Sequence, residues 1–236
     1  MTLEGEDQWL KIDHVICMVR DSTLQNGLQG ELVRADLLRS EHLKQGTTGE
    51  YYLFLNAFLE LLYATDTAAM RANAERFGKD YLPHWKDGSV SPYGIGLRLI
   101  NLRDTARLRD AFRYVPDPGN PDHFYWMDTS SSRNAPLLFV VSPGDEHPQY
   151  EDIEEIKAHA RPEILEDLIR FQMHAGGTRT LQQVTLQTSD LPDTNQGWWP
   201  DIKGLRFQSV AEHGLILHFD KGDLTLRSGD SVTTSL

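Results

Sequence analysis

The sequence is poor in cysteine, because Cys17 is the only one among 236 residues. A single cysteine cannot close an internal disulfide, so no disulfide framework is expected. Cys17 lies in the apolar run 15–19, where a buried, unreactive thiol is the expected state. No apolar run approaches the ~18 residues of a membrane span, and the acidic stretch 1–9 lacks the apolar centre of a signal peptide. The sequence therefore predicts a cytoplasmic protein.

Positive charge is also scarce. Lys and Arg number 23 against 35 Asp and Glu, which leaves a net charge of −12. A surface this negative repels phosphate backbones and anionic lipids, so we expect neither nucleic acid nor membranes as partners. Small neutral or cationic ligands are compatible with this charge.

Several catalytic motifs are absent from the sequence. It contains no Gly-x-Ser-x-Gly elbow, no His-Glu-x-x-His and no phosphate-binding loop. Gly94-x-Gly96 has no third glycine, so it is not a dinucleotide fingerprint. We expect no nucleotide cofactor.

The pattern of apolar residues and turn signals predicts an α+β chain. Two blocks of β-α-ββ type are followed by helices and then by an all-β tail. The two blocks and the tail each open with a strand that runs into an Asp- or Ser-capped turn, which is loose self-similarity. The expected strands are 11–20, 51–55, 58–63, 95–101, 123–127, 136–141, 180–188, 205–210, 214–219 and 224–227, and the expected helices are 23–28, 68–77, 104–112 and 151–173, the last broken at Arg161-Pro162.

Two details of this assignment need a choice. The aromatic-rich stretch 51–54 favours a hairpin around Asn56-Ala57, and the rival is a helix with Asn56 as its N-cap. Asp66 or Thr67 is expected to cap the helix 68–77, and Asp104 the helix 104–112.

A family resemblance rests on short motifs in a fixed order. Ile12-Asp13-His14-Val15, then Asp21, then Phe58-Leu59-Glu60-Leu61-Leu62 resembles the first βαβββ module of the vicinal-oxygen-chelate superfamily. Further motifs resemble strands and a loop of its larger glyoxalase-like subgroup; they are Thr48 to Phe54, Gly94 to Leu99, Pro136 to Phe139 with His147-Pro148, and Leu181 to Leu186.

The resemblance implies one glyoxalase-like domain over 1–236, with modules at 10–66, 93–142 and 178–228. Its fold would be α+β, with paired βαβββ modules forming curved mixed sheets around a pocket and an inserted helical segment. Its activity would be that of a small-molecule lyase, isomerase or dioxygenase relative, with one divalent metal ion that polarises vicinal oxygens.

The candidate site residues begin with His14 and Glu60. Strand alternation places His14, Ile16 and Met18 on one face, and Phe58, Glu60 and Leu62 on another. Glu60 has apolar neighbours, and burying its charge is costly unless a cation, a metal or a donor meets it.

The resemblance makes His14 and Glu60 metal ligands and Glu60 the carboxylate that moves a proton, with Gln183 as a third ligand. Thr225 stands where a second carboxylate is expected, so the ligand set is incomplete. The alternative is that His14 is a hydrogen-bonded strand histidine and that Glu60 pairs with an arginine such as Arg98.

Substrate contacts are expected from five residues, each with a structural alternative in the core or on the surface; they are Arg98, Trp126, Trp198, Trp199 and His218. Trp198-Trp199 could equally lie at the subunit contact of a homodimer. A second hypothesis is a non-catalytic protein that sequesters a hydrophobic or cationic small molecule with its tryptophans. A third is an interaction module whose acidic helices, 151–170, meet a basic partner.

Overall fold

The computed structural model describes residues 8–20, 23–77, 91–109, 111–127, 136–188, 202–210 and 212–227, and the backbone of 232–235. Its strands form two sheets. The larger sheet has the order β2-β3-β4-β1-β5-β8-β7-β6, with β10 paired to one end of β1. The smaller sheet has the order β11-β9-β12-β13-β14.

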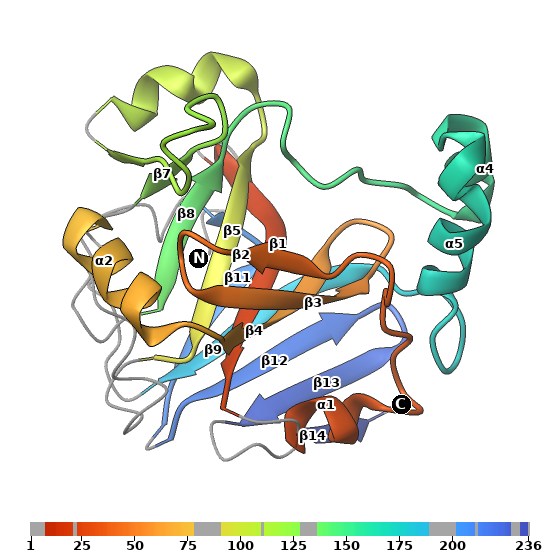
Figure 1. The fold of residues 1–236 in the computed structure, drawn as a ribbon. Coiled ribbons are helices and arrows are strands. Elements are labelled where there is room, and N and C mark those ends of the chain that lie inside the picture. Colours follow the sequence, from red (N-terminus) through yellow and green to blue (C-terminus); the bar gives the residue numbers. More distant parts are fainter. Residues whose placement is uncertain are drawn as a thin grey trace, which may run out of the picture.

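The larger sheet is built from two βαβββ modules that meet at its centre (Figure 1). In each module the first strand pairs in parallel with the last, and the two first strands, β1 and β5, pair antiparallel. This arrangement confirms the predicted α+β fold of paired modules with curved mixed sheets. The first module comprises β1 (Leu10–Val19), α1 (Thr23–Leu28), β2 (Ser40–His42), β3 (Thr47–Leu53) and β4 (Phe58–Ala64), and the second comprises β5 (Tyr93–Leu99), the 3₁₀ helix η1 (Leu102–Leu108), β6 (Phe112–Tyr114), β7 (Tyr125–Met127) and β8 (Leu137–Val141).

The hairpin around Asn56-Ala57 is confirmed, and the rival helix is wrong. β3 and β4 run antiparallel with Leu53 opposite Phe58, and the Phe54 amide donates to the Ala57 carbonyl at 2.8 Å. The aromatic and branched side chains of both strands suit a sheet that is covered on its two faces.

Helix starts follow the capping side chains. Asp66 caps α2 (Thr67–Phe77), because its Oδ1 accepts the amides of Ala68 and Ala69 at 2.8 and 3.1 Å. The prediction for 104–112 is wrong in three respects: the helix is a 3₁₀ helix, it begins at Leu102, and Phe112 already belongs to β6. Asn101 is its cap, because it reaches the Arg103 amide at 3.0 Å and starts the helix before Asp104.

The smaller sheet covers the convex face of the larger one. Alternate residues of β1, such as Val15 and Cys17, share one buried apolar cluster with Val184 and Leu186 of β9. Cys17 is 4% exposed, as expected of a core thiol. Five strands form this sheet, and β10 (Ile202–Lys203) joins the larger one; the five are β9 (Leu181–Thr188), β11 (Leu205–Ser209), β12 (Gly214–Phe219), β13 (Gly222–Arg227) and β14 (Val232–Ser235).

A helical pair is inserted between β8 and β9, and Figure 1 shows it standing to one side of the sheets. The pair is α4 (Ile153–His159) and α5 (Pro162–Gln172), with the expected break before Pro162. His174, just beyond α5, fixes its end, since Nδ1 accepts the Val33 amide at 3.0 Å and Nε2 donates to the Leu53 carbonyl at 2.7 Å. In the described part of the chain, every helix is too short or too polar to cross a membrane.

Candidate functional site

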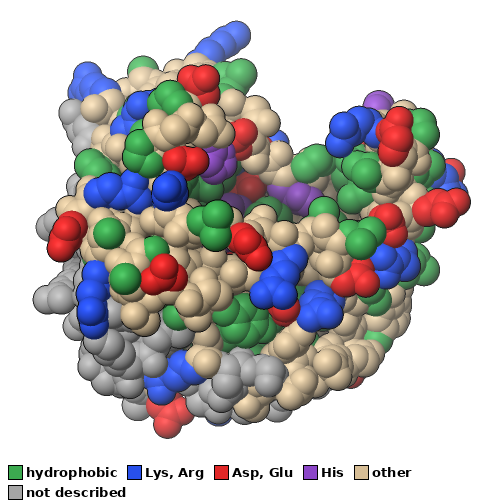
Figure 2. Space-filling view, in the orientation of Figure 1, with side chains coloured by type: hydrophobic (Ala, Val, Ile, Leu, Met, Phe, Trp, Pro, Cys, Tyr) green, Lys and Arg blue, Asp and Glu red, His purple; other side chains and the backbone are tan. Residues whose placement is uncertain are grey.

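The concave face of the larger sheet lines a cavity of about 220 Å³ that opens to solvent. The space-filling view is hollowed between the second module and the α4–α5 pair, and histidine and acidic side chains are visible in this hollow (Figure 2). Most of the cavity wall is apolar, while histidines, carboxylates and phenols supply its polar part. The apolar wall consists mainly of Ile16, Met18, Leu62, Met127, Leu137 and Val141.

The expected faces of β1 and β4 are confirmed, because His14, Ile16 and Met18 line the cavity together with Phe58, Glu60 and Leu62. The residues lie on adjacent parallel strands, in which His14 is opposite Phe58 and Ile16 is opposite Glu60. His14 and Glu60 are therefore diagonal neighbours on one face.

A β-bulge brings an unexpected residue to His14. The pairing of β1 with β5 shifts between Ile12 and His14, which leaves Asp13 as the extra residue. Asp13 also lines the cavity, and its Oδ1 lies 2.9 Å from His14 Nδ1. A carboxylate accepts, so Nδ1 carries the proton, and in the neutral ring Nε2 keeps its lone pair.

Asp13 is held on its other side as well. Its Oδ2 accepts the His147 amide at 2.9 Å and lies 3.6 Å from Arg98 Nη1, while the Arg98 guanidinium also donates to the His147 carbonyl at 2.6 Å. Burial lowers the pKa of the His147 imidazole to about 4, so that ring is neutral and adds no charge here. This network fixes the carboxylate that orients His14.

Two glycines give the polar side chains their room. A Cβ on Gly96 would lie 2.3 Å from His14 Cε1 and within 2.6 Å of both ring nitrogens. A Cβ on Gly49 would meet Glu60 Oε1 and lie 2.8 Å from the Tyr51 hydroxyl. Any larger residue at either position would have to displace a site side chain.

Glu60 is 5% exposed and lies at the polar end of the cavity. The Tyr51 hydroxyl donates to its Oε1 at 3.2 Å, and His42 Nε2 lies 3.8 Å from the same oxygen. Burial, followed by the nearby Glu60 charge, raises the pKa of the Tyr51 phenol, which therefore stays protonated and remains a donor.

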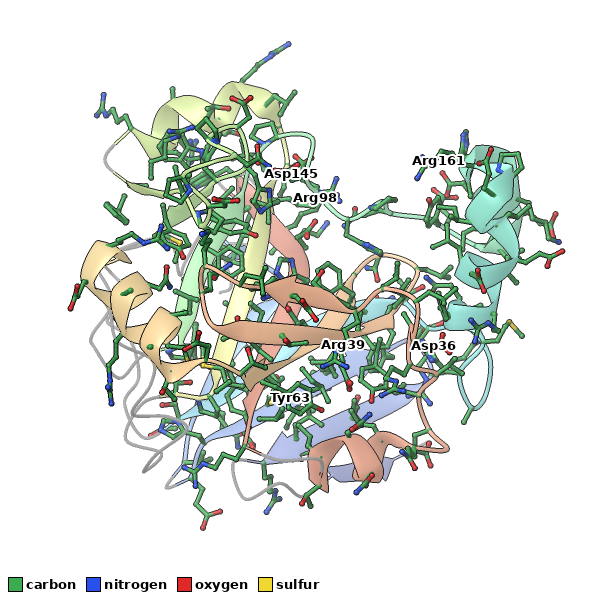
Figure 3. All side chains as sticks on the ribbon, viewed as in Figure 1. Asp36, Arg39, Tyr63, Arg98, Asp145 and Arg161 are labelled. Atoms are coloured by element: carbon green, nitrogen blue, oxygen red, sulfur yellow. The ribbon has the colours of Figure 1, made fainter. Side chains whose placement is uncertain are left out.

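A second His–carboxylate pair lies at the wall formed by the second module. His123 Nδ1 is 3.0 Å from Asp145 Oδ2, and His123 Nε2 is 3.0 Å from the Tyr125 hydroxyl. Ser142 also donates to Asp145. Burial and the charge of Glu60 raise the pKa of Tyr125, so this phenol is neutral too. Figure 3 labels Asp145 next to Arg98, beside the hollow seen in Figure 2.

The donor set does not fit the metal that the family resemblance implies. A divalent metal site takes three or four protein ligands, and within the described residues no group of three or more His, Cys, Asp and Glu is placed to hold an ion. Gly94, Gly96 and Phe139 occupy the neighbouring positions of the second module, and none offers a side-chain donor. Gln183 is not brought to the cavity, because it lies in β9 of the other sheet.

The other sequence-predicted contacts lie away from the cavity. His218 is on the outer face of the smaller sheet, where Nε2 is 2.9 Å from Thr185 Oγ1 and Nδ1 is 3.0 Å from Asp223; Gln183 donates to the same Thr185 hydroxyl. Neighbouring strands place these polar side chains opposite one another.

Arg98 and Trp126, which were also expected to contact a substrate, do not line the cavity. Arg98 pairs with Asp13 and not with Glu60, and it is not part of the cavity wall. Trp126 packs against the main core, because its neighbours Tyr125 and Met127 take the cavity side of β7. Trp198 and Trp199 lie outside the described residues.

Six polar residues of this wall that make the contacts described above were missed by sequence reasoning. Asp13 was hidden by the bulge, since simple alternation turns it away from His14. His42 and Tyr51 sit three and two strands from β1, and a run such as Tyr51-Tyr52 does not show which ring faces the cavity. The remaining three, His123, Tyr125 and Asp145, meet only because a loop returns after β8.

Comparison with known proteins supports the fold and nothing finer. No protein-family model and no curated protein sequence matches the chain. The structure is similar to that of a hypothetical protein from Staphylococcus aureus, with a TM-score of 0.50 and 10% identity over 86% of this chain and 87% of that one. It is less similar to a triple mutant of 4-hydroxymandelate synthase from Streptomyces coelicolor, with a TM-score of 0.36 and 11% identity, and it spans 62% of that chain. At these identities the likeness concerns the fold alone.

Proposed function

We propose that the chain binds a small organic molecule in the cavity of its larger sheet. The observation that supports this is a concave space of about 220 Å³ that is apolar over most of its wall and includes the polar side chains of Glu60 and His14. Concave, mostly apolar pockets with a few convergent polar groups are the usual form of small-molecule sites. Because the donor set does not fit a divalent metal, the chain's own side chains hold the molecule.

A ligand screen on a matched pair of variants tests this function. Ala74, on α2, lines the cavity, and Ala72 is exposed on the same helix. Ligand-detected NMR with a fragment library is expected to give hits that Ala74→Trp abolishes and Ala72→Trp leaves intact. Hits that survive Ala74→Trp unchanged, or a library without hits, would refute the proposal.

Acid–base chemistry is a second candidate function, favoured by the Asp13–His14 pair. The Asp13 carboxylate holds the His14 ring so that Nε2 is free to accept a proton, the arrangement that a general base needs. A molecule bound against this ring would exchange a weakly acidic C–H with solvent.

Deuterium exchange separates catalysis from simple binding. In D₂O, hits of the library screen are incubated with the wild type, with His14→Gln and with His159→Gln, an exposed histidine of α4. If the chain is a catalyst, one carbon of the hit gains deuterium with the wild type and with His159→Gln, and this incorporation is lost with His14→Gln. If the hits bind but gain no deuterium with the wild type or with either variant, the acid–base function is refuted and the chain is a binding protein.

A further inference from the structure

We infer that the occupant of the cavity carries a positively charged organic group, an ammonium, that pairs with Glu60. The inference rests on the proposed function and specifies its ligand class. It assigns to Glu60 a role different from the metal ligation that the family resemblance implies.

The charges on the wall of the cavity are one-sided. Among the described residues, its lining includes the three carboxylates Asp13, Glu60 and Asp145, and no lysine or arginine. The chain as a whole carries a net charge of −12. A cleft whose charges have one sign concentrates ions of the other sign, so this cavity favours cations over anions.

Two of the three carboxylates already have partners. Asp13 is met by His14, by the His147 amide and by Arg98. Asp145 is met by His123 and by the Ser142 hydroxyl. Asp13 is paired within the protein, and Asp145 is 41% exposed and therefore also reached by water, so neither needs a ligand.

Glu60 differs from these two. Its side chain is 7% exposed, yet among the described residues its Oε1 meets only the Tyr51 hydroxyl and, at 3.8 Å, His42 Nε2, and its Oε2 accepts no hydrogen bond. Removing a carboxylate from water costs several kcal/mol unless a charged partner or several donors offset it. A ligand cation would supply the missing partner.

The aromatic side chains that line the cavity together with Glu60 favour an organic cation over a metal ion. Phe58 stacks on His14 at 4.3 Å between ring centroids, and Phe139 meets the rings of His14 and Tyr125 edge-on at 5.3 and 5.1 Å. Ring faces attract ammonium groups but offer no lone pair to a metal. The absence of a three-donor group among the described residues points the same way.

The experiment compares one molecular frame in three charge states. Benzylamine, benzyl alcohol and benzoate are titrated by ligand-detected NMR, with benzyltrimethylammonium as a cation that cannot donate a hydrogen bond. The wild type is expected to bind the two cations about tenfold or more tighter than benzyl alcohol, and benzoate least. Glu60→Gln should erase the preference, whereas Glu41→Gln, a matched change on the outward side of β2, should keep it.

The outcomes separate the inference from the proposed function. A wild type that prefers benzyl alcohol or benzoate overturns the inference, and cavity binding then stands. If none of the four compounds binds, the test uses the library hits whose binding is lost in Ala74→Trp. The inference predicts that most of these hits are cations, and a majority of neutral or anionic hits overturns it. If instead Mn²⁺, Ni²⁺ or Zn²⁺ competes with benzylamine in the wild type and fails to do so in Glu60→Gln, that result identifies a metal ion as the occupant and overturns the inference. The wild-type charge series stays decisive even where Glu60→Gln folds poorly.

Discussion

Protonation of His174 is expected to weaken the fold in mild acid. The ring is 5% exposed and uses both nitrogens, since Nδ1 accepts the Val33 amide and Nε2 donates to the Leu53 carbonyl. A proton on Nδ1 would remove that acceptor and bury a charge near Arg179. Burial, with the Arg179 charge as a smaller cause, lowers the pKa of His174 from 6.5 to about 4.

The size of the effect follows from this shift. The unfolded chain binds the proton below its ordinary pKa of 6.5 and the folded chain only near 4, so the stability is complete above pH 6.5 and falls as the pH drops toward 4. A shift of about two and a half units corresponds to between about 3 and 4 kcal/mol of unfolding free energy, and about 3 kcal/mol of it is lost by pH 4, where the folded ring is half protonated.

Urea unfolding at pH 7, 6, 5 and 4 measures the loss. The wild type should lose about 3 kcal/mol more than His174→Gln between pH 7 and pH 4, whatever the stability of the variant at pH 7. His159→Gln, which changes an exposed histidine, should follow the wild type. Parallel curves for the wild type and His174→Gln would refute the argument that His174 is held neutral by burial.

Two further predictions concern β5 and the core. Gly96→Ala should cost about 1–3 kcal/mol and shift the NMR signals of His14, because its Cβ would clash with that ring. Gly94→Ala should cost less than about 1 kcal/mol, since its Cβ would meet Ile16 at an ordinary 3.5 Å; equal costs for the two variants would contradict the close approach at Gly96. The Cys17 thiol, 4% exposed, should resist a thiol reagent until the protein unfolds, and rapid labelling of the folded protein would show that this part of the core opens.

Strand alternation made part of the cavity predictable from sequence. A period of two fixes which residues of a strand share a face, so His14 with Ile16 and Glu60 with Leu62 followed once the strands were assigned. The hairpin at Asn56-Ala57 then placed Glu60 in β4. Local rules were sufficient here because each depends on a few consecutive residues.

The partners of these residues could not be predicted in the same way. Gln183 was expected at the cavity because the third block was taken to repeat the first, and His218 because the last sheet was expected to face a pocket, but these strands form the sheet behind the cavity. The apolar face of this smaller sheet covers the core, and its polar face points outward. Alternation alone shows that a strand has an apolar and a polar face, but it does not show whether the polar face lines the cavity or the outer surface. The His123–Asp145 contact joins residues 22 positions apart, and no local pattern marks it.

The bulge at Asp13 also changes the phase of β1. Before it, the even-numbered Leu10 and Ile12 pack on the core, and after it the odd-numbered Val15 and Cys17 do so. Ile12 and His14 pair with the consecutive residues Leu97 and Gly96 of β5, so deleting Asp13 would restore simple alternation and keep the other side chains of β1 on their present faces. The extra residue therefore supplies the carboxylate beside His14, and the fold is expected to tolerate its deletion.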